Sequence, residues 1–361
     1  FACGMCNGFR IYNTEPLKEK ERQDFPGESG SGGAMGGVRL IEMLYRCNYV
    51  GLAFSNNPKY PPNKAVIWDD VKKKFVIEME FASEVLAIRL RREKIVIGLH
   101  TAVKVFTFTQ PPSLLHVFES SPNPHGLIAL CPSSDRQLLA FPGHSSGSVA
   151  LADLGQPDRP KGQSANLLHA HEGRLAALSM NSRGTLLATA SEKGTLIRVF
   201  QLPQQQQQQP QLLHELRRGS QPARVYCVTF SSDSGLLCAA SDRGTVHVFR
   251  LDYNDQQLSQ RASGESQQQQ HHALEASPAT AAASVAKFFS QVTSVARLPI
   301  QPGVPTVCAF GQDSLGRTCS LIAITASGNY LKFKLGPGSI SDQVHREVYT
   351  NYLDMTQDSN N

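Results

Sequence analysis

The sequence has no long hydrophobic run. In its 361 residues no apolar stretch approaches the ~18–20 residues that cross a bilayer, so any membrane contact must be peripheral. Charged residues make up only 18% of the chain and the formal net charge is +5. That charge is compatible with phosphate binding and far below what a general nucleic-acid binder carries.

The sequence also lacks the motifs of the common enzyme classes. We find no nucleophile elbow, no zinc-protease helix and no Walker loop, and the single Cys-x-x-Cys pair, Cys3 and Cys6, has no partner set that would complete a zinc site. Most other cysteines lie in apolar strand-like runs, which indicates reduced thiols in the core of a cytosolic protein. We therefore predict a protein that is not an enzyme and has no catalytic residue, metal or cofactor.

The chain opens without methionine. Residues 1–5 already have the pattern of a strand, so we expect residues to be missing upstream and the N-terminal strands to be truncated.

The strongest positive signal is an internal repeat. Leu187–Phe200 and Leu237–Phe249 each combine a strand of small residues, a polar turn containing glycine and an alternating strand that ends on an aromatic residue, which is the pattern of a hairpin. Weaker copies bring the total to seven units. They lie at Cys3–Asn13, Ala65–Asp70, Ile95–Phe108, Leu138–Asp153 and Leu321–Phe333.

Seven such units fill a chain of this length, because a four-stranded blade needs about 40–45 residues. We predict an all-β fold, a single seven-bladed β-propeller of the WD-repeat type over residues 1–361. Three segments interrupt the period: a flexible glycine-rich loop at 24–37, a polyglutamine insertion at 203–210 and a disordered loop of the sixth blade at 251–286.

Two adjacent aromatic residues, Phe288 and Phe289, follow the third of these segments. One interpretation is the start of the next strand. The other is a loop that inserts apolar side chains into a membrane interface.

Two adjacent arginines, Arg217 and Arg218, lie at the seam between the two strongest repeats. Because successive side chains of a strand point to opposite faces, one dipeptide can supply two separate anion sites. The alternative is that these charges protect a sheet edge from pairing with other chains. Two other basic clusters, Lys72–Lys74 and Arg89–Arg92, are predicted to be solvated surfaces; the alternative is that they add to the attraction of the protein to a membrane.

The motif Leu216-Arg217-Arg218-Gly219, between the hairpins Ser191–Thr195 and Ser241–Thr245, resembles the signature of the PROPPIN family of phosphoinositide-binding propellers. The resemblance extends along nearly the whole chain and is to the WIPI branch of the family. It is carried by Phe9–Lys20, Pro58–Lys64, Ile67–Asp70 and Leu139–Gly143.

The resemblance implies two lipid pockets. The first would use Ser191, Gly194, Thr195, Arg198 and Arg217, and the second would use Arg218, Ser241, Thr245 and His247. It also implies membrane insertion of the sixth-blade loop, with Phe288 and Phe289 as the inserting residues, and a partner surface near Asn57–Asp70. His247 is expected to become cationic at mildly acidic pH and so to favour lipid binding.

The function implied is that of a monomeric effector, which binds phosphatidylinositol 3-phosphate and 3,5-bisphosphate on membranes and recruits the lipid-transfer protein and related machinery of autophagosome formation. It would be cytosolic and recruited peripherally to preautophagosomal, endosomal or lysosomal membranes, without binding nucleic acid. The alternative is a protein-interaction scaffold with no dependence on lipid.

Overall fold

The structure is a computed structural model that describes residues 1–25, 37–55, 57, 59–155, 166–203, 208–251, 292–336 and 344–356. Within these ranges the only helix is the single 3-10 turn η1 (Asp354–Thr356), and all other regular structure is β-strand. The chain divides into two compact units, Phe1–Arg174 with Asn351–Asn361, and Leu175–Thr350.

The first unit contains four antiparallel sheets, in which strands that follow one another in sequence are hydrogen-bonded neighbours. Sheet 1 is β1 (Ala2–Met5), β2 (Gly8–Thr14) and β3 (Leu17–Asp24), and sheet 2 is β4 (Val38–Met43), β5 (Tyr49–Phe54), β6 (Lys64–Asp69) and β7 (Lys74–Glu80). Sheet 3 is β8 (Ala87–Arg91), β9 (Lys94–Gly98), β10 (Ala102–Thr107) and β11 (Leu114–Glu119), and sheet 4 is β12 (Ala129–Leu130), β13 (Leu138–Pro142), β14 (Ser148–Asp153) and β15 (Asn166–His169).

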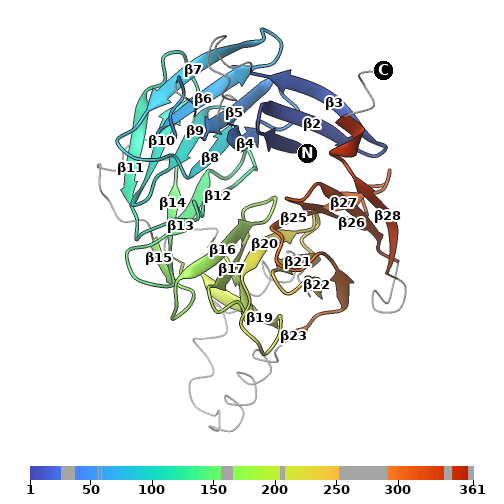
Figure 1. Cartoon of the computed structure of the whole chain (residues 1–361). Helices are drawn as coiled ribbons and strands as arrows, with labels where there is room; N and C mark the ends of the chain where they lie inside the picture. The colour runs from blue at the N-terminus through green and yellow to red at the C-terminus, as the bar shows by residue number, and fades with distance from the viewer. Residues whose placement is uncertain are drawn as a thin grey trace, which may run out of the picture. The chain divides into compact units, whose positions relative to one another are not determined.

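The second unit contains three sheets (Figure 1). Sheet 5 is β16 (Leu175–Met180), β17 (Leu186–Ser191), β18 (Leu196–Gln201), β19 (Gln211–Arg217) and, paired in parallel with β19, β23 (Val292–Thr293). Sheet 6 is β20 (Val225–Phe230), β21 (Leu236–Ser241), β22 (Thr245–Arg250) and β24 (Ala296–Pro299), and sheet 7 is β25 (Thr306–Gln312), β26 (Thr318–Thr325), β27 (Asn329–Lys334) and β28 (His345–Asn351).

Each of the seven sequence repeats falls in a different sheet. The two strong repeats form the hairpins β17–β18 and β21–β22, and the weaker ones include β13–β14 and β26–β27. These hairpins are the inner strands of their sheets, where both faces are covered, and small and branched apolar side chains fill such positions.

The core of the second unit lies between neighbouring sheets. Apolar residues of sheets 5 and 6 form one buried cluster, which includes Ile197, Leu216 and Phe249. Sheets 6 and 7 share another, which includes Val246 and Phe333. Alternate residues of sheet 6 thus face two different cores, and this alternation decides which polar side chains can lie together at the end of the sheet.

All eight cysteines are free thiols. Cys131, Cys238 and Cys308 are buried, in agreement with the sequence prediction, whereas Cys6 and Cys47 are exposed.

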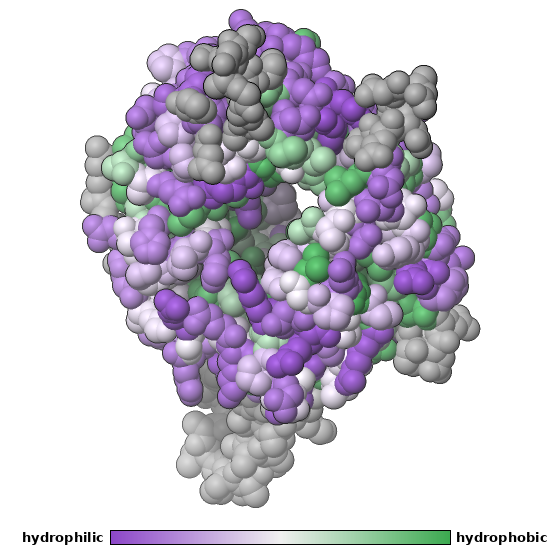
Figure 2. All heavy atoms as spheres, viewed as in Figure 1, coloured by the Kyte–Doolittle hydropathy of each residue, from purple (hydrophilic) through white to green (hydrophobic). Residues whose placement is uncertain are grey.

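On the face shown in Figure 2, hydrophilic side chains predominate and hydrophobic ones form scattered patches.

The predicted loops at 24–37, 203–210 and 251–286 lie largely outside the described residues, so their flexibility and disorder stay predictions.

Candidate anion-binding site

Strand β19 places the two adjacent arginines in different surroundings. Leu216, the preceding residue, is fully buried in the core that sheets 5 and 6 share. Arg217 is exposed, whereas Arg218 is only 5% exposed. Since neighbouring side chains of a strand alternate, Arg217 lies on the face of sheet 5 that points away from sheet 6.

Backbone carbonyls hold Arg218 in place. Its Nε donates a hydrogen bond to the carbonyl oxygen of Gly194 at 2.5 Å, and its Nη2 donates to the carbonyl oxygen of Gln221. Burial lowers the pKa of the Arg218 guanidinium; Asp242 opposes this shift and Arg243 adds to it. The reference value lies so far above neutrality that the group stays cationic.

The turn at Gly194 requires glycine. Its φ is +62°, and a Cβ there would lie 1.9 Å from the carbonyl oxygen of Ala223. The next residue, Thr195, accepts hydrogen bonds through its carbonyl oxygen from the amides of Arg218 and Gly219, at 3.0 and 3.4 Å. The turn therefore fixes the backbone of the arginine motif.

Three of the residues predicted for the first pocket share one face of sheet 5. Ser191 is the last residue of β17, Arg198 lies within β18, and Arg217 is the last residue of β19. Arg217 pairs with Leu196, which lies two residues before Arg198. Their neighbours Ala190 and Ile197 point into the core with sheet 6, so the three polar side chains lie on the opposite face.

The same face carries a carboxylate that sequence reasoning missed. Arg198 pairs in register with Glu215, and its Nε donates to Glu215 Oε2 at 2.9 Å. Glu215 lies two residues before Arg217 on β19, and alternation along a strand puts two such side chains on the same face. The sequence could have revealed Glu215 by this spacing. An anion at Arg198 would therefore compete with an existing ion pair.

Three of the four residues predicted for the second pocket share the face of sheet 6 that points toward sheet 5. Ser241 pairs with Thr245, and Ala239 pairs with His247. Ala239 and Phe249, on either side of this set, both belong to the core with sheet 5. Thr245, His247 and buried Ser241 thus lie on the face of sheet 6 that points toward sheet 5 and toward Arg218 at the end of β19.

The imidazole of His247 has a lowered pKa and is neutral at neutral pH. It is 6% exposed, and burial, Arg218 and Arg297 together lower the pKa of its imidazole to about 4. The expectation that His247 becomes cationic at mildly acidic pH is therefore wrong for the free protein. The reason is that burial and two neighbouring guanidinium groups all disfavour a positive charge.

Ser241 carries an unsatisfied group. Its side chain is fully buried, and its Oγ has no hydrogen-bond partner among the residues that the structure describes. A bound water or ion is one of the ways in which such a buried hydroxyl is satisfied in proteins.

Two further residues join this set from β24 and the link before it. Ser294 Oγ lies 3.2 Å from His247 Nδ1, and Arg297 Nε donates to the same hydroxyl at 3.3 Å. Arg297 also pairs with His247 in register. No local pattern in the sequence indicated these two residues, because residues 252–291 separate β22 from this segment.

Phe288 and Phe289 lie outside the described residues, so membrane insertion there stays a prediction. The expected partner surface near Asn57–Asp70 is mostly interior. Strand β6 is buried from Ala65 to Asp69, and the exposed part of this segment is the turn around Lys59.

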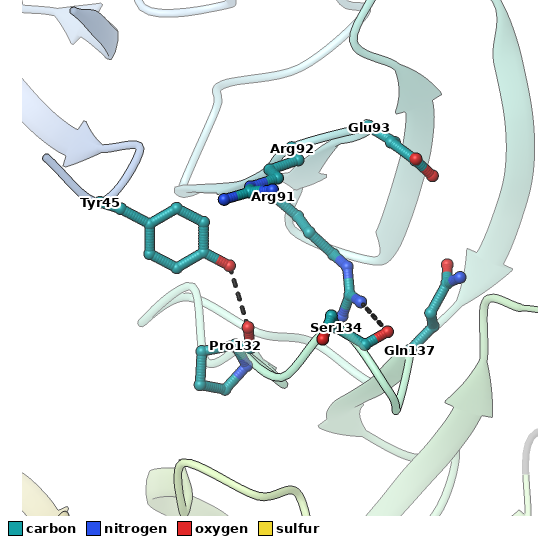
Figure 3. A pocket seen from close by; sticks show the side chains of 7 residues that line it. All are labelled: Tyr45, Arg91, Arg92, Glu93, Pro132, Ser134 and Gln137. Carbon is teal, nitrogen blue, oxygen red and sulfur yellow. Dashed lines mark hydrogen bonds between the residues drawn. The ribbon is translucent and has the colours of Figure 1, made fainter. Parts of the chain in front are cut away.

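The first unit contains a separate hollow of about 510 Å³ (Figure 3). Arg91 forms one wall, since its guanidinium donates to the carbonyl oxygens of Cys131, Ser134 and Arg136 at 2.9 to 3.2 Å. The prediction that the whole Arg89–Arg92 cluster is solvated is therefore wrong, because Arg91 is 8% exposed and satisfied by a loop. The lining residues are Tyr45, Arg91, Arg92, Glu93, Pro132, Ser134 and Gln137.

In the part of the chain that the structure describes, no helix is long and apolar enough to cross a membrane. The same residues contain no group of three or more histidine, cysteine, aspartate or glutamate side chains that could hold a metal ion.

Comparison with known proteins identifies the fold and the family. The chain resembles the solved structure of Kluyveromyces lactis Hsv2 with its complete loop 6CD, at a TM-score of 0.71 and 23% identity over 96% of this chain and 94% of that one. It also resembles KlAtg21 in complex with the coiled coil of AgAtg16, at a TM-score of 0.72 and 20% identity over 96% and 93% of the two chains. These likenesses confirm the seven-bladed β-propeller fold.

Among curated proteins, Autophagy-related protein 18e of Arabidopsis thaliana is 36% identical over 70% of this chain and 63% of its own length. The matched segments cover 60–68% of the length of the curated relatives. The model of one family, PROPPIN, matches residues 9–347. The chain therefore belongs to the PROPPIN family.

Proposed function

We propose that this chain is a phosphoinositide effector that acts by binding and not by catalysis. Its first pocket is formed by Ser191, Gly194, Thr195, Arg198 and Arg217, and its second by Arg218, Ser241, Thr245 and His247. Its ligands are phosphatidylinositol 3-phosphate and phosphatidylinositol 3,5-bisphosphate. The observation that carries the proposal is the placement of Arg217 and Arg218 on different sides of sheet 5, each with hydroxyl groups from a glycine-containing hairpin.

Two pockets of this kind would act together. A single exposed headgroup site is weak, because binding must offset desolvation and ordering of the side chains. Two sites on one protein make the second contact intramolecular, which raises the overall affinity by about 10²–10⁴. Membrane association would then be peripheral and would depend on the density of the lipid.

Membrane binding would serve recruitment. We propose that the protein is a cytosolic monomer that associates with preautophagosomal, endosomal or lysosomal membranes and brings the autophagy machinery, including a lipid-transfer protein, to sites of autophagosome formation. Family membership and the naming of its relative from Arabidopsis thaliana as autophagy-related support this role. The complex of KlAtg21 with the coiled coil of AgAtg16 is a precedent for partner binding by a protein of this fold.

The test is flotation with liposomes that contain phosphatidylinositol 3-phosphate, another phosphoinositide, or phosphatidylserine alone. We expect the native chain to float selectively with the 3-phosphorylated lipids and the Arg217→Thr/Arg218→Thr chain to stay at the bottom. Arg250→Thr, which removes an exposed arginine at the other end of β22, is the matched control and should float like the native chain.

Because Arg218 is buried, circular dichroism and a melting curve must accompany the double variant. Flotation of native and double-variant chains to the same extent would overturn the proposal. The same would follow if the native chain did not float with any lipid. A scaffold propeller that does not depend on lipid would then be the better description.

A further inference from the structure

A short link ties sheet 5 to sheet 6 beside the second pocket. Strand β23 pairs in parallel with β19 at Leu216 and Arg217, and Figure 1 shows the two strands side by side. The chain then passes through Ser294 and Val295 into β24, which pairs with β22. The pairing therefore fixes this link where the arginine motif, β22 and β24 meet.

The link and β24 bring two polar side chains to His247. Ser294 Oγ lies within hydrogen-bond distance of both His247 Nδ1, at 3.2 Å, and Arg297 Nε, at 3.3 Å. Arg297 is exposed, so its guanidinium can meet a ligand from solvent. Arg218 and Arg297 both act electrostatically on His247, which places the imidazole under the influence of two cations.

The two pockets differ in charge. In the first, the carboxylate of Glu215 already offsets the charge of one guanidinium, that of Arg198. The second has Arg218 and Arg297, with Arg243 and Asp242 in the adjoining turn.

The adjoining turn does not cancel the positive charge of Arg218 and Arg297. Asp242 Oδ1 accepts a hydrogen bond from the amide of Arg224 at 3.1 Å, and its electrostatic effect on Arg218 is opposed by that of Arg243. The second pocket therefore keeps the charge of two guanidinium groups.

We propose that Arg297 is a further binding residue of the second pocket, held in position by Ser294, and that it makes this pocket the site for the more highly phosphorylated headgroup. The inference rests on the proposed function. Each phosphate adds a charge of about −1.5 to −2 and three acceptor oxygens. A headgroup with phosphates on two ring positions besides the lipid linkage can offer Arg218 and Arg297 a phosphate each, whereas with a single such phosphate the two guanidinium groups would have to share it. The buried Ser241 hydroxyl, which has no partner in the described part of the chain, is a further group that a ligand or its water could satisfy.

The experiment uses the full chain with Arg217→Thr, which disables the first pocket at an exposed position. Isothermal titration compares inositol 1,3-bisphosphate, inositol 1,3,5-trisphosphate and inorganic phosphate. We expect the trisphosphate to bind about tenfold more tightly than the bisphosphate, the effect of one additional charge-assisted hydrogen bond. Adding Arg297→Gln should abolish this preference and change bisphosphate affinity by less than about threefold. Arg250→Gln, the matched control, should change neither.

Ser294 is tested as a positioning residue. Ser294→Ala should reduce the preference for the trisphosphate, and Ser294→Thr, which keeps the hydroxyl, should restore it. A trisphosphate preference that survives Arg297→Gln would overturn the inference and leave the proposed function intact. Absence of binding to either inositol phosphate in the chain that still has Arg217 would instead overturn the proposed function. Inorganic phosphate binding as tightly as the trisphosphate would show an anion site without headgroup selectivity, which also contradicts the inference.

Discussion

Arg218 and Gly194 are joined by a hydrogen bond from the guanidinium Nε to the glycine carbonyl oxygen at 2.5 Å. A residue of the second proposed pocket is thus anchored to the turn that forms part of the first. The two arginines of the motif should therefore differ in their effect on folding, although they are adjacent and chemically identical.

Replacing Arg218 should destabilise the protein. Arg218→Thr leaves the buried carbonyl of Gly194 without its donor and removes the hydrogen bond to the carbonyl of exposed Gln221, at a cost of about 1–3 kcal/mol in the free energy of unfolding. Arg217→Thr removes an exposed side chain and should change stability by no more than about 0.5 kcal/mol. Urea unfolding of the two single variants checks this, and equal midpoints would contradict the structural role of Arg218.

The two glycines near the motif should respond differently to alanine. Gly194→Ala forces a left-handed backbone on a residue with a Cβ and drives that atom against the carbonyl of Ala223, so we expect a loss of at least about 1–2 kcal/mol. A Cβ on Gly219 would meet nothing within 4 Å. Gly219→Ala is therefore the matched control, and thermal melting should leave it close to the native chain. A fully stable Gly194→Ala protein would show that the turn can rearrange.

Acid should weaken the fold through His247. Its folded-state pKa, about 4, lies below the usual value of 6.5, so the unfolded chain binds a proton that the folded chain does not. The contribution of His247 to the free energy of unfolding is therefore present above pH 6.5 and is lost as the pH falls from there toward 4. The free energy of unfolding should be lower by about 2 kcal/mol at pH 5 than at pH 7. Urea unfolding of the native chain and of His247→Gln at both pH values measures this contribution. An identical pH dependence of the two proteins would show that His247 is not responsible.

Removing the carboxylate of the first pocket should strengthen anion binding there. Glu215→Gln takes away the ion-pair partner of Arg198 and one negative charge from that face, so the affinity for inositol 1,3-bisphosphate should rise by about threefold to tenfold. Titration calorimetry on the native and variant chains gives the ratio. Glu119→Gln, an exposed position on β11 of the first unit, serves as the control. Unchanged or weaker binding in Glu215→Gln would indicate that the Arg198–Glu215 pair orients the site and does not mask it.

The hairpins and the placement of the arginine motif could be predicted because both depend on local rules. The turns at Gly194 and Gly244, each with positive φ, are visible as repeated glycines, and the alternation of a strand separates Arg217 from its buried neighbour.

What depended on long-range pairing could not be predicted. Ser294 and Arg297 reach His247 only through the register of β24, and Arg91 is buried because carbonyls of a loop some 40 residues later accept its hydrogen bonds. Neither arrangement leaves a pattern in the local sequence. The pKa of His247 was mispredicted for the same reason, since one of the two arginines that lower it comes from β24.

The parallel pairing of β23 with β19 has a consequence for the motion of the motif. The outermost strand of a sheet ordinarily exposes its amides on one side and exchanges their hydrogens with solvent through small local openings. At Leu216 and Arg217 a fifth strand covers that side. The backbone amides around the arginine motif should therefore exchange with deuterium as slowly as those of an inner strand, and the motif should behave as a rigid part of the sheet.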